Sequence, residues 1–225
     1  MPVFDLAEQP LRALNAALHA SGGDNGRFEV LNPRGAHSVA VGVEHPCEIE
    51  VMGPVGYYCG GMNEAGEITV RGSAGPGLAE NMMGGRVVVE GDASQYAGAT
   101  GHGGLLVIRG SAASRCGISL KGLDIVVGGS IGHMSAFMAQ SGRMVVLGDA
   151  GEALGDSIYE ARIYVRGTVK SLGTDCIEKP MRDEHRAEVA SLLEAAGIEA
   201  DPADFRRYGS ARKLYHFDVD HADAY

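Results

Sequence analysis

The sequence has no tryptophan, only 21% charged residues and no apolar run long enough to cross a membrane. A spanning helix needs about 20 consecutive apolar residues, and the opening MPVFDLAEQP carries no basic segment followed by an apolar one. We therefore expect neither a membrane span nor a signal peptide. The formal net charge of −10 disfavours nucleic acid or an anionic lipid surface as the main partner.

Cysteine is also scarce and widely spaced, at Cys47, Cys59, Cys116 and Cys176. Cys59 and Cys116 share one position of the repeat described below, three coils and therefore about 14 Å apart. A disulfide needs Cα atoms about 4.4–6.8 Å apart, and no cysteine pair has the spacing of a zinc site. We predict free thiols, no metal and a reducing, cytoplasmic location.

Glycine is abundant, with 34 residues in 225. The stretch RVVVEGDASQYAGATGHGG (86–104) resembles a strand followed by a phosphate-binding loop. Such a loop needs a helix directly after the glycines, because the helix N-terminus supplies the amide donors. The β-branched LLVIRG follows instead. The stretch is therefore not a phosphate cradle, and we predict no cofactor in this chain.

The glycines have a period of 19 residues without a gap: Gly53, Gly72, Gly91, Gly110, Gly129, Gly148 and Gly167. Two residues before them stand Val51, Val70, Val89, Ile108, Val127, Val146 and Val165. Four residues before them stand Ile49, Ile68, Val87, Leu106, Ile125, Met144 and Ile163. Alternate residues of a strand face the same side, so both columns are expected to point inward.

Nineteen residues are too few for a strand–helix–strand unit, which needs about 30, but they suffice for one coil of a parallel β-helix. Crossovers between parallel strands are right-handed almost without exception. We therefore predict an all-β fold, a right-handed parallel β-helix of seven 19-residue coils over residues 48–180. The glycines of the 98–104 stretch then lie at corners, where a positive φ or close stacking excludes a side chain.

The two ends, residues 1–47 and 181–225, lack the repeat. Pro10 opens a helix with Leu11, Leu14 and Leu18 on one stripe and Ser21-Gly22-Gly23 as its stop. Residues 24–47 are predicted as an irregular lead-in, with HSVAVGV (37–43) as a strand. A second helix is predicted at 183–196, with Val189, Leu192 and Leu193 as its stripe, before an acidic tail at 215–225. Because an open solenoid end is an unpaired sheet edge, we expect short capping helices at both ends.

Few polar residues are placed to act together. Asp156 and Asp175 share a position in adjacent coils, and a carboxylate separation of about 5 Å is typical of a retaining glycosidase; two solvated turn residues are the alternative. His102 and His133 occupy different corners, which disfavours a shared metal. In the tail, the candidate cation ligands are His216, Asp218, Asp220 and His221. We predict no catalytic, cofactor-binding or metal-binding residues.

Two charged columns alternate along the repeat, Glu48–Glu67–Arg86 and Arg71–Glu90–Arg109. We interpret both as surface ladders, in which each exposed pair contributes little.

One column breaks the alternation. Three residues before each marker glycine the side chain should face water, yet the residues there are Glu50, Thr69, Val88, Val107, Val126, Val145 and Tyr164. A contiguous apolar strip on a soluble protein usually marks an interface. We predict that Val88, Val107, Val126 and Val145, the valine strip, face a partner, or that the chain's own C-terminal helix covers them.

The longer motifs carry a family resemblance: GYYCGGMNEAGEITVRGSAGPGLAENMMGG (56–85), ASQYAGATGHGGLLVIRGSAASRCGISLKG (93–122), GHMSAFMAQSG (132–142) and GEALGDSIYEARIYVRG (151–167). They resemble the glycine-repeat (GXGXG) domain of glutamate synthase, and more closely its stand-alone form, the B subunit of N-methylglutamate synthase. The similarity covers nearly the whole chain. It implies a non-catalytic β-helix that joins a glutaminase-type amidotransferase to an FMN and iron–sulfur synthase.

The resemblance further implies that the complex makes N-methylglutamate from methylamine and glutamate and releases ammonia. This sequence has no N-terminal cysteine nucleophile, FMN barrel or iron–sulfur cysteine cluster. The amidotransferase and the FMN-binding synthase are therefore expected as separate chains of a hetero-oligomer.

Two other functions stay open. The C subunit of formylmethanofuran dehydrogenase, or of the formyltransferase/hydrolase complex, has a related glycine repeat, and fold analogy alone does not separate the families. A polysaccharide-acting β-helix enzyme would need a cluster of Asp, Lys and Arg on neighbouring coils, and none is evident.

Overall fold

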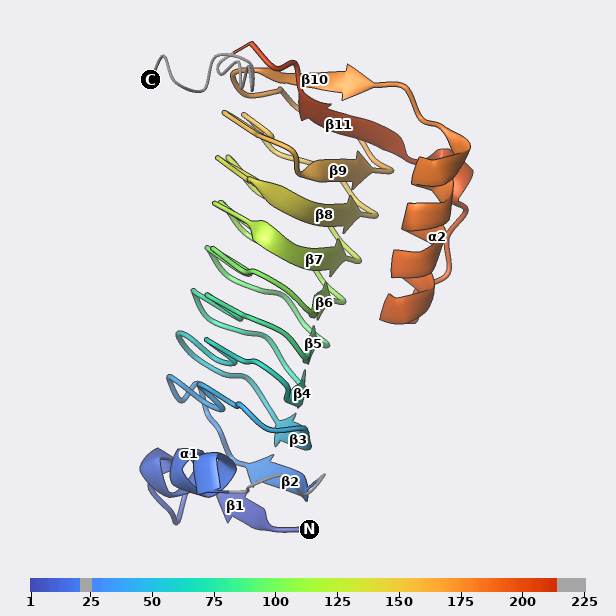
Figure 1. Cartoon of the computed structure of the whole chain (residues 1–225). Coiled ribbons are helices and arrows are strands. Elements are labelled where there is room, and N and C mark those ends of the chain that lie inside the picture. The colour runs from blue at the N-terminus through green and yellow to red at the C-terminus, as the bar shows by residue number, and fades with distance from the viewer. Residues whose placement is uncertain (21–25, 214–225) are drawn as a thin grey trace, which may run out of the picture.

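The computed structural model describes residues 1–20 and 26–213. The predicted helix stop at 21–23 and the predicted acidic tail at 215–225, with its four candidate cation ligands, lie outside the described residues. Eleven strands, two α-helices and one 3-10 turn form the described chain (Figure 1). The strands are β1 (Val3–Asp5), β2 (Gly26–Leu31), β3 (Cys47–Met52), β4 (Glu67–Val70), β5 (Arg86–Val89), β6 (Leu105–Ile108), β7 (Lys121–Val127), β8 (Ser141–Val146), β9 (Arg162–Val165), β10 (Cys176–Lys179) and β11 (Arg206–Ser210). The helices are α1 (Leu11–Ala20), α2 (Asp183–Ala196) and η1 (Pro202–Asp204).

The predicted parallel β-solenoid is confirmed. Strands β1 to β9 stack in chain order as neighbours in one sheet, and from β3 onward each pairs with the next in parallel, as in Ile68↔Val87 and Val70↔Val89. All the side chains of the two aliphatic columns are buried, with exposures of 1% or less. The period of 19 therefore places like residues on top of one another, and the core is a stack of aliphatic layers.

The solenoid begins earlier than residue 48, because β2 pairs in parallel with β3. The strand predicted at 37–43 is wrong. Ser38, Ala40 and Gly42 have φ angles of 56°, 53° and 64°, so the chain turns there instead of extending. Val39, Ala40 and Val43 are buried. The apolar residues at alternate positions, Val39, Val41 and Val43, are the pattern that predicts a strand.

The same turn recurs in every later coil as a row of left-handed residues at alternate positions. In one coil they are Tyr96, Gly98 and Thr100, with φ of 64°, 68° and 54°. The amide of Gly98 donates to the Leu78 carbonyl of the preceding coil at 2.8 Å, whereas those of Tyr96 and Thr100 donate to the following coil. The middle residue faces the core, since a Cβ on Gly98 would lie 2.7 Å from Ile125 Cδ1. This explains why the middle residue of the turn is small in successive coils: Ala40, Gly60, Ala79, Gly98, Gly117, Ala136 and Gly155.

The marker glycines are required by close stacking at the corner that follows each strand. Pro54 follows the first marker glycine, and the polar residues Ser73, Asp92, Ser111, Ser130, Asp149 and Thr168 follow the other six. Ser111 Oγ, for example, accepts from the amide of Ser130 one coil further on, and Asp92 Oδ1 accepts from that of Ser111. A Cβ on Gly129 would lie 2.3 Å from Ser111 Oγ. Glycine is therefore needed because the polar ladder of the previous coil fills the space of a Cβ.

The two helices have different roles. Helix α1 covers the first coils, with Leu14 and Leu18 fully buried in the main core, as predicted. At the other end, β11 lies between β9 and β10 and pairs antiparallel with both. Strand β10 is therefore the last strand of the sheet. Helix α2 has the predicted bounds but does not cap the end, because it lies beside the stacked strands along the outer face of the sheet (Figure 1).

We expect Val89→Asp to unfold or aggregate the protein, because Val89 is fully buried and an unpaired carboxylate is costly inside an apolar core. Thr69→Asp, in the adjacent strand but on the outer face, is the matched control and should melt cooperatively. Thermal unfolding followed by circular dichroism checks both variants. A folded Val89→Asp chain would show that the inward register is wrong.

Candidate functional site

The candidate carboxylate pair, Asp156 and Asp175, does not occupy matching positions of adjacent coils. The last coil is one residue shorter, so Leu154 stacks on Leu172 and Gly173 packs against Asp156. Burial would raise the pKa of Asp156, but hydrogen bonds from the Thr174 amide and the Ser157 hydroxyl outweigh it and lower the pKa. Asp175 instead accepts from the Ser210 hydroxyl and the Lys213 amide. Asp156 therefore lacks the environment of a raised-pKa general acid.

The other candidates are dispersed. In the part of the chain that the structure describes, no three His, Cys, Asp or Glu side chains gather as metal ligands would. The four cysteines are free and buried, as predicted. Burial raises the pKa of Cys59 and of Cys116 to about 12, which leaves neutral thiols without nucleophilic character.

The valine strip is covered by the chain's own helix, which is the second of the two arrangements considered above. Val88 is 7% exposed and the other three valines of the strip are fully buried. Helix α2 packs on them through Val189, Leu192, Leu193 and Ala196. Tyr164, the last residue of the same outer column, is also fully buried in this cluster. With α2 in place the strip faces the helix, and a partner has to bind elsewhere.

Polar contacts hold the C-terminus of α2. Arg86 donates to the carbonyl of Ala195 at 2.7 Å, and Arg109 donates to that of Gly197 at 3.0 Å. Cations stabilise the negative end of a helix dipole, so these two arginines of the predicted ladders anchor the C-terminus of α2. The ladder pattern itself gave no sign of that role.

Further toward the N-terminus of α2, Glu188 bonds to both Arg162 and Tyr164 of β9. Burial would raise the pKa of Glu188, but the hydrogen bonds from Tyr164 and Arg162 outweigh it and lower the pKa. Glu188 is therefore a charged anchor between helix and sheet.

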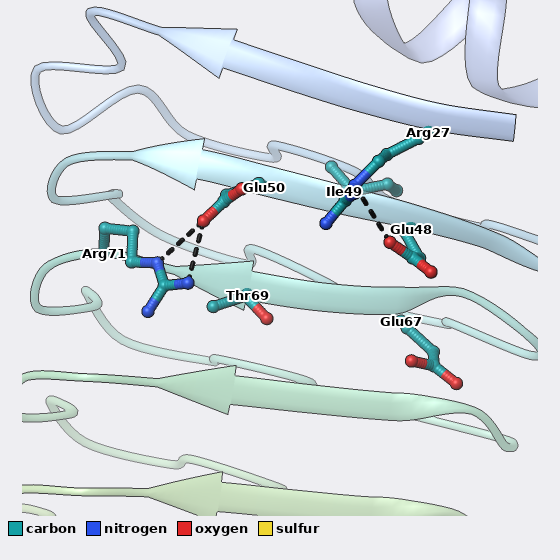
Figure 2. Close-up of a pocket in the computed structure, with 7 residues that line it drawn as sticks. All are labelled: Arg27, Glu48, Ile49, Glu50, Glu67, Thr69 and Arg71. Carbon is teal, nitrogen blue, oxygen red and sulfur yellow. Dashed lines mark hydrogen bonds and ion pairs between the residues drawn. The ribbon is translucent and has the colours of Figure 1, made fainter. Parts of the chain in front are cut away.

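The outer face of β2, β3 and β4 is not covered by α2 and carries charged side chains. Of the two predicted ladders, the Arg71–Glu90 contact is formed, whereas Arg86 and Arg109 bind the carbonyls at the end of α2. Arg71 pairs with Glu50 at 2.8 Å and with Glu90 at 3.4 Å, and Arg27 pairs with Glu48 at 3.0 Å. These side chains line a shallow depression of about 120 Å³ (Figure 2). We call this surface the open face. It is a candidate contact surface, because its charges are accessible and held in fixed register by the strands beneath.

The chain is 67% identical to "Protein GlxC" of Rhizobium meliloti (strain 1021), over 228 aligned residues that span all of both chains. The chain belongs to the GlxC family. No protein-family model matches it. Of the helices within residues 1–20 and 26–213 of this family member, none combines the length and apolarity needed to span a bilayer.

Val107→Glu should destabilise the isolated chain, because Val107 is fully buried beneath α2. We expect a loss on the order of 3 kcal/mol, the size typical of an unpaired charge placed in a core. For a chain of this size that corresponds to a fall in Tm of roughly 6–12 °C. Thr69→Glu lies in the same outer column on the open face and should leave Tm nearly unchanged. Equal melting of Val107→Glu and the unaltered chain would contradict the burial of the strip by α2.

Proposed function

We propose that this chain is the non-catalytic scaffold subunit of a glutamate-synthase-like complex, N-methylglutamate synthase. In this proposal it joins a glutaminase-type amidotransferase subunit to an FMN and iron–sulfur synthase subunit. The complex converts methylamine and glutamate to N-methylglutamate and ammonia. The observation that carries the proposal is the set of extended glycine-repeat motifs, which resemble those of the GXGXG domain of glutamate synthase.

The structure supports a scaffold role through the location of those motifs. Their glycines lie at corners and turns, where Gly98 and Gly110 are needed for packing within the chain. The motifs therefore build a rigid stack. From β2 to β9 the stack has seven strand spacings, or about 34 Å at 4.8 Å each. A rod of this length can hold two larger subunits at a fixed separation.

The partner contacts are expected on surfaces that α2 leaves open. The open face is the first candidate, since accessible charges in fixed register favour selective recognition of a complementary surface. Our proposal places the FMN and the iron–sulfur clusters in the synthase subunit and the glutaminase chemistry in the amidotransferase subunit. This chain contributes geometry to the assembly and no reacting group.

The purified chain alone should be colourless and should not turn over glutamine, glutamate or methylamine. Its buried, neutral thiols offer no nucleophile for glutamine hydrolysis. Absorbance spectroscopy and assays of ammonia and N-methylglutamate check this. Flavin absorbance that persists through gel filtration, or turnover without added subunits, would contradict the non-catalytic assignment.

Co-expression tests the assembly. We expect this chain to elute together with the amidotransferase-type and FMN-binding chains encoded in the same genome, as one hetero-oligomer. Omitting it should abolish N-methylglutamate formation that depends on both other subunits, while each retains its own cofactor. The proposal fails if the other two chains assemble and reach full activity without it. Co-elution with formyltransferase-type subunits instead would favour the second family.

A further inference from the structure

A second depression lies at the C-terminal end of the solenoid, where strands β9, β10 and β11 meet the start of α2. It has a volume of about 330 Å³ and is lined by Arg162, Lys179, Arg182, Arg207 and Arg212. We call it the basic pocket. Its walls come from four separate elements between residues 159 and 212, so no short linear motif marks it.

The charge of the basic pocket is opposite to that of the protein. Five of the 19 lysine and arginine residues line it, but only two of the 29 acidic residues, Glu160 and Glu184, do so. The lining therefore carries a formal charge of +3 in a chain with a net charge of −10. Such a local excess of positive charge is not expected from the ladders, in which the sign of the charge alternates.

The cations are held in place by contacts that leave donors to spare. Arg207 Nε donates to the Pro180 carbonyl at 3.1 Å, and Lys179 Nζ donates to the Ser210 carbonyl at 2.6 Å. Three of the five cations are ion-paired: Arg212 with Glu160 at 3.0 Å, Arg182 with Glu184 at 3.6 Å and Arg162 with Glu188. Each contact uses one nitrogen, whereas a guanidinium has five N–H donors and an ammonium has three. The backbone contacts fix the direction of Arg207 and Lys179 without neutralising their charge.

His185 adds a neutral donor to the wall. Its side chain is only 6% exposed, and its Nδ1 accepts a hydrogen bond from the Arg182 amide at 3.1 Å. In a neutral imidazole this bond places the proton on Nε2. Burial, and then the charge of Arg207, lower the pKa of His185 and favour that neutral form.

We propose that the basic pocket binds a small oxyanion with at least two negative charges, either a di- or tricarboxylate or a phosphate. Planar guanidinium groups bind carboxylate and phosphate oxygens in bidentate pairs, and several converging cations favour a ligand with more than one charge. The site is formed within this single chain and does not depend on the proposed function.

The test is isothermal titration calorimetry of the full chain with inorganic phosphate, succinate and citrate at constant ionic strength. We expect saturable binding of one molecule per chain for at least one of the three. Acetate, with a single charge, should bind about tenfold more weakly or worse because it can form only one bidentate contact. A preference for phosphate or for the carboxylates identifies the source of the ligand, and either preference supports the proposal.

The double variant Arg182→Gln/Arg212→Gln should weaken binding about tenfold or more, since it removes two charge-assisted contacts. Both side chains are more than half exposed, with exposures of 69% and 67%, so the fold should tolerate the change. The matched control is Arg27→Gln/Arg71→Gln on the open face, which alters net charge equally at the other end of the rod. Beyond a Debye length of about 10 Å its effect is screened, so the affinity should be nearly unchanged.

Hydrogen exchange on the unaltered chain provides an independent measurement. A bound anion should protect backbone amides of 182–186 and 206–212 and leave those of the open face unaffected. The proposal is overturned if none of the three anions binds saturably, if both double variants weaken binding equally, or if the anion protects no amide of the pocket.

Discussion

The contact between one coil and the next at the glycine corner is the constraint on which the rest of the structure depends. Ser111 fills the space in which Gly129 would otherwise carry a side chain, and its hydroxyl accepts from the amide of Ser130. An added methyl group at the marker position would push successive coils apart and break the pairing of the strands. The corner thus keeps the coils in register, and the register produces the buried aliphatic columns. Departures are local, at the shift between Lys121 and Asp124 and in the shortened last coil.

Because like residues stack, the outer face has the same composition along several coils at once. Five apolar residues of its column, from Val88 to Tyr164, span four strand spacings, or about 19 Å. Helix α2 has 14 residues and is about 21 Å long at 1.5 Å per residue. The helix therefore matches the strip in length, and its arginine contacts at Ala195 and Gly197 mark where the match ends. Strands β2, β3 and β4, which α2 does not cover, keep their charged outer face open to contacts outside the chain.

The repeat also decides where chemistry can be concentrated. Along the stack, a charged residue meets a coil neighbour that is often of opposite sign, as Arg71 does with Glu50 and Glu90. Such ladders are stable and largely neutral. The basic pocket arises only where the repeat stops, because β10, β11 and the start of α2 follow no period and can place Lys179, Arg182 and Arg207 together.

The sequence by itself determined what the period of 19 controls. Local spacing predicts the coils, the two inward columns and the small residues of the turns, since each coil contacts only its neighbours. The bounds of α2 lie outside the repeat and follow from the apolar stripe of the helix itself. The pattern failed at 37–43, because the valines at alternate positions there lie in a left-handed turn. It also failed at Asp156 and Asp175, where one missing residue moved Gly173 into the stacking position.

Only the tertiary structure decided where α2 lies. Its stripe of Val189, Leu192 and Leu193 fits an open solenoid end as well as an outer strip, since burial of apolar surface has no preferred direction. The choice depends on the length of the strip and on Arg86 and Arg109, which lie about 90 to 110 residues earlier than the carbonyl groups they bind. The basic pocket was hidden for the same reason, because its walls are brought together only when the chain's end folds back onto β9.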